Sequence, residues 1–276
     1  MTYQMNTLFI LGIILIVLNL LIYINSEYVF NMLLYYISND RYYNTKLNLG
    51  SSPTSFGNTS ELKYSNELYT KVLTIAQKHI DNMSNISILE APCLNINGAN
   101  HIAMKFNAKQ IICLTPDKTL KKTIDPYIQN NNQIEFVLDN PNNINKTNIN
   151  NKNIDLILTI EASRHNYKYN SLLLNFGNFL LPKRFWVIAD LFNVSQFREF
   201  RLIAKKYKLL IKEVVDISNN VLESINSDSK RKESFIDTFF LGKKQLIESF
   251  ITTNSNVYNN LLNGKIQYLV VIITKV

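Results

Sequence analysis

The sequence from Ile88 to Ala103 reads ILEAPCLNINGANHIA, a short apolar run that ends in an acidic residue and is followed by a loop and the start of a helix. This order is typical of the first strand, turn and helix of a doubly wound α/β domain, where the turn holds a nucleotide cofactor. Such turns carry several glycines, because backbone N–H groups must approach the ligand closely. In this loop Gly98 is the one glycine, and bulky or polar residues fill the positions before it, namely Pro92, Leu94, Asn95 and Ile96. The stretch therefore predicts the fold of a cofactor-binding enzyme without its usual cofactor loop.

Helix-like and strand-like segments alternate from residue 61 to the end of the chain. The spacing of apolar residues predicts helices at 61–80, 101–106, 118–129, 171–179 and 196–206. Short apolar runs predict strands at 86–89, 110–114, 134–138, 154–160, 185–189, 209–215 and 266–273. This alternation implies a mostly parallel sheet with helices on both faces. The Asn-rich residues 140–153 are predicted to form an enlarged loop.

The N-terminal segment differs from the rest of the chain. Thr7–Ile24 is an apolar run of about the length that spans a bilayer. The residues before it lack positive charge and no small-residue cleavage site follows, which favours a membrane anchor over a cleaved signal peptide. Because Arg41 and Lys46 follow the span and no basic residue precedes it, we expect the body in the cytoplasm. A single-pass membrane protein is predicted, with an anchor and juxtamembrane helix at 1–43 and one domain at 44–276.

Charge and cysteine usage narrow the possible partners. The formal net charge of +8 lies in short lysine clusters without interleaved aromatic residues. This pattern favours a solvated surface or one that faces anionic lipid headgroups, and we expect no nucleic-acid partner. The two cysteines, Cys93 and Cys113, are too few for a disulfide framework and lack metal-ligand spacing, so we expect reduced thiols and no metal. Both follow strands that should be neighbours, and we expect them close together in a structural role.

Four blocks of the chain resemble successive motifs of the class I S-adenosylmethionine-dependent methyltransferases. They are ILEAPCLNINGANHIA, IEASRH at 160–165, LLPKRFWVIADL at 180–191 and VLESINSDSKRKESFID at 221–237. The nearest branch acts on lipid ketones and phenols and includes the phthiotriolone and phenolphthiotriolone dimycocerosate methyltransferases. The likeness covers about residues 47–276. It implies a Rossmann-like seven-stranded mixed sheet in which 266–273 is an antiparallel strand inserted near the edge.

The resemblance assigns cofactor-binding roles to individual residues. Glu90 matches the acidic residue that opens the family's glycine motif, and Gly98 is what remains of its glycines. Asp139 or Asn140 lies where an adenine-facing acid is usual. Cys113 stands where the family has a carboxylate that accepts hydrogen bonds from the ribose hydroxyls, and a neutral thiol cannot replace that carboxylate. The cofactor motif is thus degenerate.

Three further residues are candidates for the site. Glu161 follows the fourth strand at the edge where open α/β sheets bind ligands, so it is a contact for the cofactor amine or the methyl acceptor, or a polar loop residue inherited with the fold. His165 is a candidate general base, or a solvated loop histidine. Asp190, at the end of the fifth strand, is a candidate site residue or a helix cap.

Two functions follow from these patterns. The first is a membrane-anchored, catalytically impaired or inactive methyltransferase-like protein that serves as a structural or interaction module through its surface, with a protein partner and no cofactor. The second is an active methyltransferase that takes S-adenosylmethionine and acts on a lipid or another hydrophobic small molecule. The degenerate loop favours the first function, whereas Glu90 and Glu161 favour the second.

Overall fold

The computed structural model describes residues 63–80, 82–93, 96–116, 132–144, 149, 153–165, 167–240 and 251–275. The chain divides into two units, Met1–Thr45 and Lys46–Val276, and every described residue belongs to the second. The predicted anchor Thr7–Ile24 and the helix predicted at 118–129 lie outside the described residues, so both stay predictions. Within the described part, no helix combines the length and the apolar character that crossing a bilayer requires.

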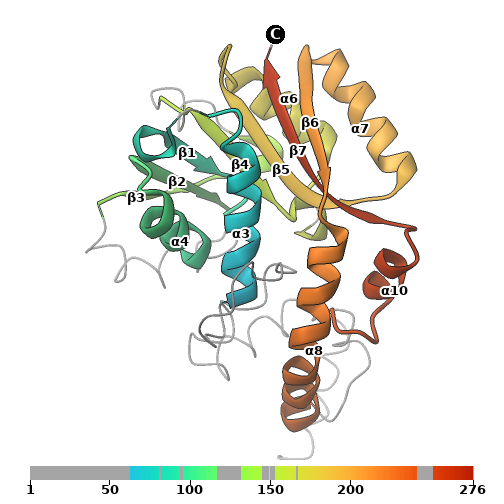
Figure 1. Cartoon of the computed structure of the whole chain (residues 1–276). Coiled ribbons are helices and arrows are strands. Elements are labelled where there is room, and N and C mark those ends of the chain that lie inside the picture. Colours follow the sequence, from blue (N-terminus) through green and yellow to red (C-terminus); the bar gives the residue numbers. More distant parts are fainter. Residues whose placement is uncertain are drawn as a thin grey trace, which may run out of the picture. The chain divides into compact units, whose positions relative to one another are not determined.

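A seven-stranded mixed sheet with the order β3-β2-β1-β4-β5-β7-β6 forms the centre of the described fold (Figure 1). Its strands are β1 (Ser87–Glu90), β2 (Gln110–Thr115), β3 (Ile134–Leu138), β4 (Leu156–Ile160), β5 (Phe185–Phe192), β6 (Leu209–Asp216) and β7 (Gln267–Lys275). Strands β1 to β5 pair in parallel, and β7 runs antiparallel between β5 and β6. The predicted Rossmann-like sheet with a reversed strand near its edge is confirmed.

The helices cover the sheet on both sides, as the alternating pattern predicts. They are α3 (Lys63–Ala76), α4 (Ile96–Phe106), α6 (Tyr169–Phe179), α7 (Val194–Lys206), α8 (Ser218–Phe240) and α10 (Asn256–Leu262). Helix α3 packs against α4, and α6 packs against α7. The two pairs lie on opposite faces of the sheet (Figure 1). The inner strands β1, β2, β4, β5 and β7 are therefore buried from both sides, which explains their apolar runs. The edge strand β6 instead alternates with exposed residues.

The direction of each strand side chain decides which helices it meets. Leu89 of β1 and Ile112 of β2 belong to the buried cluster that contains Phe176 of α6. Successive side chains of a strand point to opposite faces of the sheet. The next residues, Glu90 and Cys113, therefore project toward the face that α3 and α4 cover.

Local sequence signals place the helix ends only in part. Helix α4 begins at Ile96, inside the stretch predicted as a loop, and not at residue 101. Helix α7 begins at a capping box, in which the Asn193 side chain accepts a hydrogen bond from the Gln196 N–H and the Gln196 side chain accepts one from the Asn193 N–H. Strand β5 continues to Phe192. Asp190 thus lies within the strand, and because Asn193 caps helix α7, the helix-cap alternative for Asp190 is wrong.

Candidate functional site

Three sulfur or oxygen side chains meet where β1 and β2 end. Glu90 is the last residue of β1 and pairs in register with Cys113 of β2. The backbone N–H of Cys93 donates to the Leu114 carbonyl at 2.8 Å, so the chain leaving β1 continues beside β2. One oxygen of Glu90 and the sulfur atoms of Cys93 and Cys113 all lie within 4.8 Å of one another, and all three residues are buried. The predicted proximity of the two cysteines is confirmed.

Helix α3 supplies a fourth member of this group, which we name the β1–β2 cluster: Tyr69, Glu90, Cys93 and Cys113. The Tyr69 hydroxyl donates to Oε1 of Glu90 at 2.6 Å, and both residues are buried. Oε2 of Glu90 is also buried, and it has no hydrogen-bond partner in the described part of the chain. Burial raises the pKa of Glu90 to about 7, although the Tyr69 hydroxyl and the Cys93 thiol both favour its charged form. The cluster therefore holds a carboxyl group that titrates near neutral pH.

Gly98 lies in helix α4 and not in a ligand-binding turn. A Cβ atom added at this position would overlap the phenol end of the Tyr69 ring. The absence of a side chain at Gly98 thus allows α4 to approach α3 closely enough for Tyr69 to reach Glu90. This packing requirement explains the glycine without a cofactor.

The other predicted cofactor contacts are only partly described. Asp139 follows β3, its N–H donates to the Thr115 carbonyl at 3.0 Å, and its carboxylate accepts from the Asn140 N–H at 2.7 Å. Leu94 and Asn95 lie outside the described residues, as do the side chains of Ile96 and His165. The candidate general base is therefore not placed relative to the other site residues.

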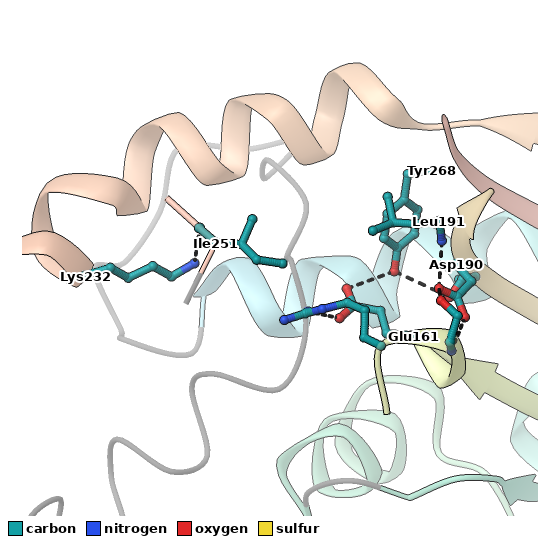
Figure 2. A network of polar contacts seen from close by, with 9 residues as sticks. Glu161, Asp190, Leu191, Lys232, Ile251 and Tyr268 are labelled. Atoms are coloured by element: carbon teal, nitrogen blue, oxygen red, sulfur yellow. Dashed lines mark hydrogen bonds and ion pairs between the residues drawn. The ribbon is translucent and has the colours of Figure 1, made fainter. Parts of the chain in front are cut away.

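A second polar group lies where β4 and β5 end (Figure 2). Glu161 directly follows β4, is fully buried, and pairs with Arg164. Its Oε1 accepts a hydrogen bond from the Tyr268 hydroxyl at 3.1 Å. The φ of Glu161 is +52°, a left-handed conformation that residues other than glycine rarely adopt. The same conformation occurs at Asn107, Lys183, Lys208 and Ile251, so it does not by itself distinguish a ligand contact from a polar loop residue at Glu161.

Asp190 is the second buried carboxylate of this group. It accepts hydrogen bonds from the Ser163 N–H at 2.8 Å, the Ser163 hydroxyl at 2.6 Å, the Leu191 N–H at 2.7 Å and the Tyr169 hydroxyl. Burial raises the pKa of Asp190, and these donors oppose the increase. The Tyr268 hydroxyl lies between the two carboxylate residues: it donates to Glu161 and approaches the carbonyl of Ala189, the residue before Asp190 (Figure 2). Sequence patterns did not indicate Tyr169 or Tyr268, because both reach the site only through the folding of distant segments.

Replacement of Glu90 by glutamine is expected to stabilise the protein above neutral pH. The folded state binds more protons than the unfolded state between pH 4.5 and about 7, so stability falls as the pH rises through this window. Between pH 5 and pH 8 the parent protein should lose about 2 kcal/mol of unfolding free energy through Glu90, and we expect Glu90→Gln to remove this loss. Urea unfolding at pH 5 and pH 8 in metal-free buffer measures the difference. Glu213→Gln is the control, because Glu213 has its pKa lowered by His79, and this variant should keep the loss of the parent protein. A parent protein equally stable at both pH values would contradict the assignment.

Solved structures of methyltransferases share this fold. A putative sarcosine dimethylglycine methyltransferase from Galdieria sulphuraria superposes with a TM-score of 0.67 at 12% identity, covering 89% of this chain and 97% of that one. The geranyl diphosphate C-methyltransferase from Streptomyces coelicolor A3(2), solved with Mg²⁺, geranyl diphosphate and S-adenosyl-L-homocysteine, gives 0.57 at 13% identity over 86% and 96%. An O-methyltransferase from a trans-AT multienzyme of Brevibacillus brevis gives 0.56 at 15% identity over 83% and 84%.

A structure with a different chemistry shares the fold as well. The 4+2 cyclase SpnF superposes with a TM-score of 0.59 at 9% identity, covering 83% of this chain and 87% of that one. Neither the models of protein families nor the curated proteins contain a match to the chain. The chain thus has the fold of the class I S-adenosylmethionine-dependent methyltransferases, and at these identities the likeness concerns the fold alone.

Proposed function

We propose that the chain is a membrane-anchored protein with a methyltransferase fold that does not use S-adenosylmethionine and acts through its surface, by binding another protein. The observation that carries this proposal is the β1–β2 cluster. The position of the expected ribose-binding carboxylate holds a fully buried thiol, Cys113, and the neighbouring acid, Glu90, is bonded to Tyr69 of α3. The side chains of Glu90 and Cys113, which should face a cofactor, instead lie buried between the sheet and helix α3.

The described residues do not fit the cofactor. A carboxylate that accepts two ribose hydrogen bonds contributes about 1.5 to 3 kcal/mol for each, and a buried thiol supplies neither. The loop adds to this loss, since Leu94 and Ile96 stand where glycines let the backbone approach the ligand. Together these losses amount to about 4 to 8 kcal/mol, or roughly three to six decades in affinity. A site of ordinary micromolar affinity would no longer bind.

An active methyltransferase that acts on a lipid or another hydrophobic small molecule is the second candidate. The group around Glu161 supports it, because a buried carboxylate lies at the edge of the sheet where α/β enzymes bind ligands. The branch of the family that the sequence resembles acts on lipid ketones and phenols, so the methyl acceptor would belong to that class. This candidate requires that the loop leaving β1 holds the cofactor in another way.

The test restores the missing groups and measures cofactor binding. We expect the triple variant Leu94→Gly, Ile96→Gly and Cys113→Asp to bind S-adenosylmethionine measurably, while the unaltered chain does not. The affinity for S-adenosylmethionine will recover only in part, because Cys113→Asp places a second carboxyl group beside Glu90 and the two like charges repel. A variant with the same two glycines and Cys113→Ser is the matched control, since serine restores no charge. Equal binding by the two variants would contradict the role assigned to position 113.

The anchor is tested separately. Because Thr7–Ile24 is apolar and uncharged, we expect the full-length protein to stay in the membrane fraction after an alkaline carbonate wash. A chain that begins at Asn44 should appear in the supernatant. Recovery of the full-length protein in the supernatant would remove the anchor from the proposal. Protease protection of the body then tests its proposed cytoplasmic side, which rests on Arg41 and Lys46.

A further inference from the structure

The fold brings three metal-binding side chains together from positions whose spacing in the sequence shows no metal motif. Glu90 and Cys113 face each other on adjacent parallel strands. Cys93 joins them because its backbone bonds to Leu114 and thereby continues the strand pairing by three residues beyond Glu90. The carboxylate oxygen and the two sulfur atoms lie within 4.8 Å of one another. No long side chain has to swing inward to assemble the group.

One atom of this group lacks a partner that a protein interior normally supplies. Oε2 of Glu90 is buried without a hydrogen bond in the described part of the chain, whereas Oε1 is held by Tyr69 at 2.6 Å. A buried acceptor left unpaired costs about 1 to 3 kcal/mol, and more when it is charged. A bound cation beside Oε2 would remove this cost. The Tyr69 hydroxyl would then act as the outer hydrogen-bond donor that fixes the orientation of a metal-binding carboxylate.

We propose that Glu90, Cys93 and Cys113 bind a thiophilic divalent metal ion of the Zn²⁺ type. Two thiolates and one carboxylate form a donor set that suits Zn²⁺ and does not suit Mg²⁺ or Ca²⁺, which prefer oxygen ligands. Tetrahedral coordination with zinc–sulfur bonds of about 2.3 Å separates the sulfur atoms by roughly 3.7 Å. The present separations of at most 4.8 Å therefore need a contraction of about 1 Å, which side-chain rotation provides. Both thiols lose their protons on binding, and water completes the fourth position.

The bound ion would join the loop that leaves β1 to strand β2. Because the ion binds only the folded chain strongly, it stabilises the fold by an amount that grows with its concentration. The inference does not rest on the proposed loss of cofactor binding. If the protein binds both the metal and S-adenosylmethionine, the proposed function fails and the metal site stands.

Titration with Co²⁺ as a spectroscopic substitute for Zn²⁺ tests the site. The full-length protein is purified with a thiol-free reductant and stripped with a chelator. One equivalent of Co²⁺ is expected to produce a sulfur-to-cobalt charge-transfer band in the near ultraviolet and the visible bands of tetrahedral cobalt, and one equivalent of Zn²⁺ should remove both. Cys93→Ser and Cys113→Ser should each weaken binding by at least about 100-fold and reduce the charge-transfer band, and Tyr69→Phe should weaken it by roughly 10-fold.

Two controls separate this site from binding elsewhere and from loss of the fold. Glu213→Gln should leave the titration unchanged, because Glu213 pairs with Lys78 and His79 and is not part of the β1–β2 cluster. Cys113→Asp keeps a ligand at the same position, so it should retain Co²⁺ binding with a weaker charge-transfer band even if Cys113→Ser fails to fold. A stoichiometric titration without a charge-transfer band, or a band that survives both serine substitutions, would overturn the proposal.

Discussion

Asp190→Ala is expected to reduce the free energy of unfolding by about 4 kcal/mol. The substitution removes the acceptor of four hydrogen bonds, two from Ser163, one from Tyr169 and one from the Leu191 N–H. These donors surround a fully buried side chain, so each donor left unpaired costs about 1 to 3 kcal/mol, and water that enters the space recovers part of this cost. Because domains of this size are stable by only 5 to 15 kcal/mol or so, the variant should unfold at clearly lower urea concentration.

Asp216→Ala provides the matched control for this prediction. Asp216 ends β6, and its carboxylate also accepts hydrogen bonds from a following serine, with the Ser218 N–H at 2.8 Å, and from Gln267 at 2.8 Å. It is exposed, so water can replace the lost acceptor. We expect a loss of about 1 kcal/mol or less. Equal losses for the two variants would mean that the burial of Asp190 does not stabilise its network.

Gly98→Ala is expected to destabilise the protein by about 3 kcal/mol, although alanine is the better helix former. The added Cβ atom would overlap the Tyr69 ring, which is buried and bonded to Glu90. The ring must move, and the Glu90 carboxylate then loses its donor. Tyr69→Leu removes the ring atoms that collide, so the double variant should be more stable than the sum of the two single effects predicts. Denaturant unfolding of the four proteins in the cycle measures this coupling.

Gly177→Ala is the control for the helix position. Gly177 lies in helix α6, and a Cβ atom there would approach only the end of the Leu209 side chain, at 3.2 Å. The leucine end can adjust, so we expect a change within about 1 kcal/mol. A loss at position 98 no larger than that at 177 would contradict the close contact of α3 and α4.

The strands were predictable because local patterns contain their signal. The run at 134–138 is apolar except for Glu135 and is bounded by polar residues, and it forms β3 with the predicted bounds. The reversed strand β7 followed from the family resemblance, since an apolar run by itself does not indicate strand direction. The ends of the helices were less predictable than the strands. Helix α4 starts at Ile96 because tertiary contact with α3 extends it into residues whose composition is typical of a loop.

The candidate site was only half predictable from the sequence. The resemblance placed Glu90 and Glu161 at the two strand ends where they lie, and it indicated that Cys113 replaces a carboxylate. It gave no reason to expect Tyr69 beside Glu90 or Tyr268 beside Glu161. Tyr69 lies in α3 and Tyr268 in β7. The position of these elements relative to Glu90 and Glu161 depends on the packing of the whole core, which local sequence patterns do not contain. The sequence pattern also treated Gly98 as a remnant of a cofactor motif, whereas the structure gives it a packing role.

The most direct test of the central claim is a calorimetric titration of the unaltered full-length protein with S-adenosylmethionine. The account predicts no measurable binding at cofactor concentrations of about ten to a hundred micromolar, the range in which ordinary enzyme sites work. The prediction rests on the buried thiol of Cys113 and on the bond between Tyr69 and Glu90. Saturable binding with one equivalent in that range would contradict the account and would favour the active methyltransferase.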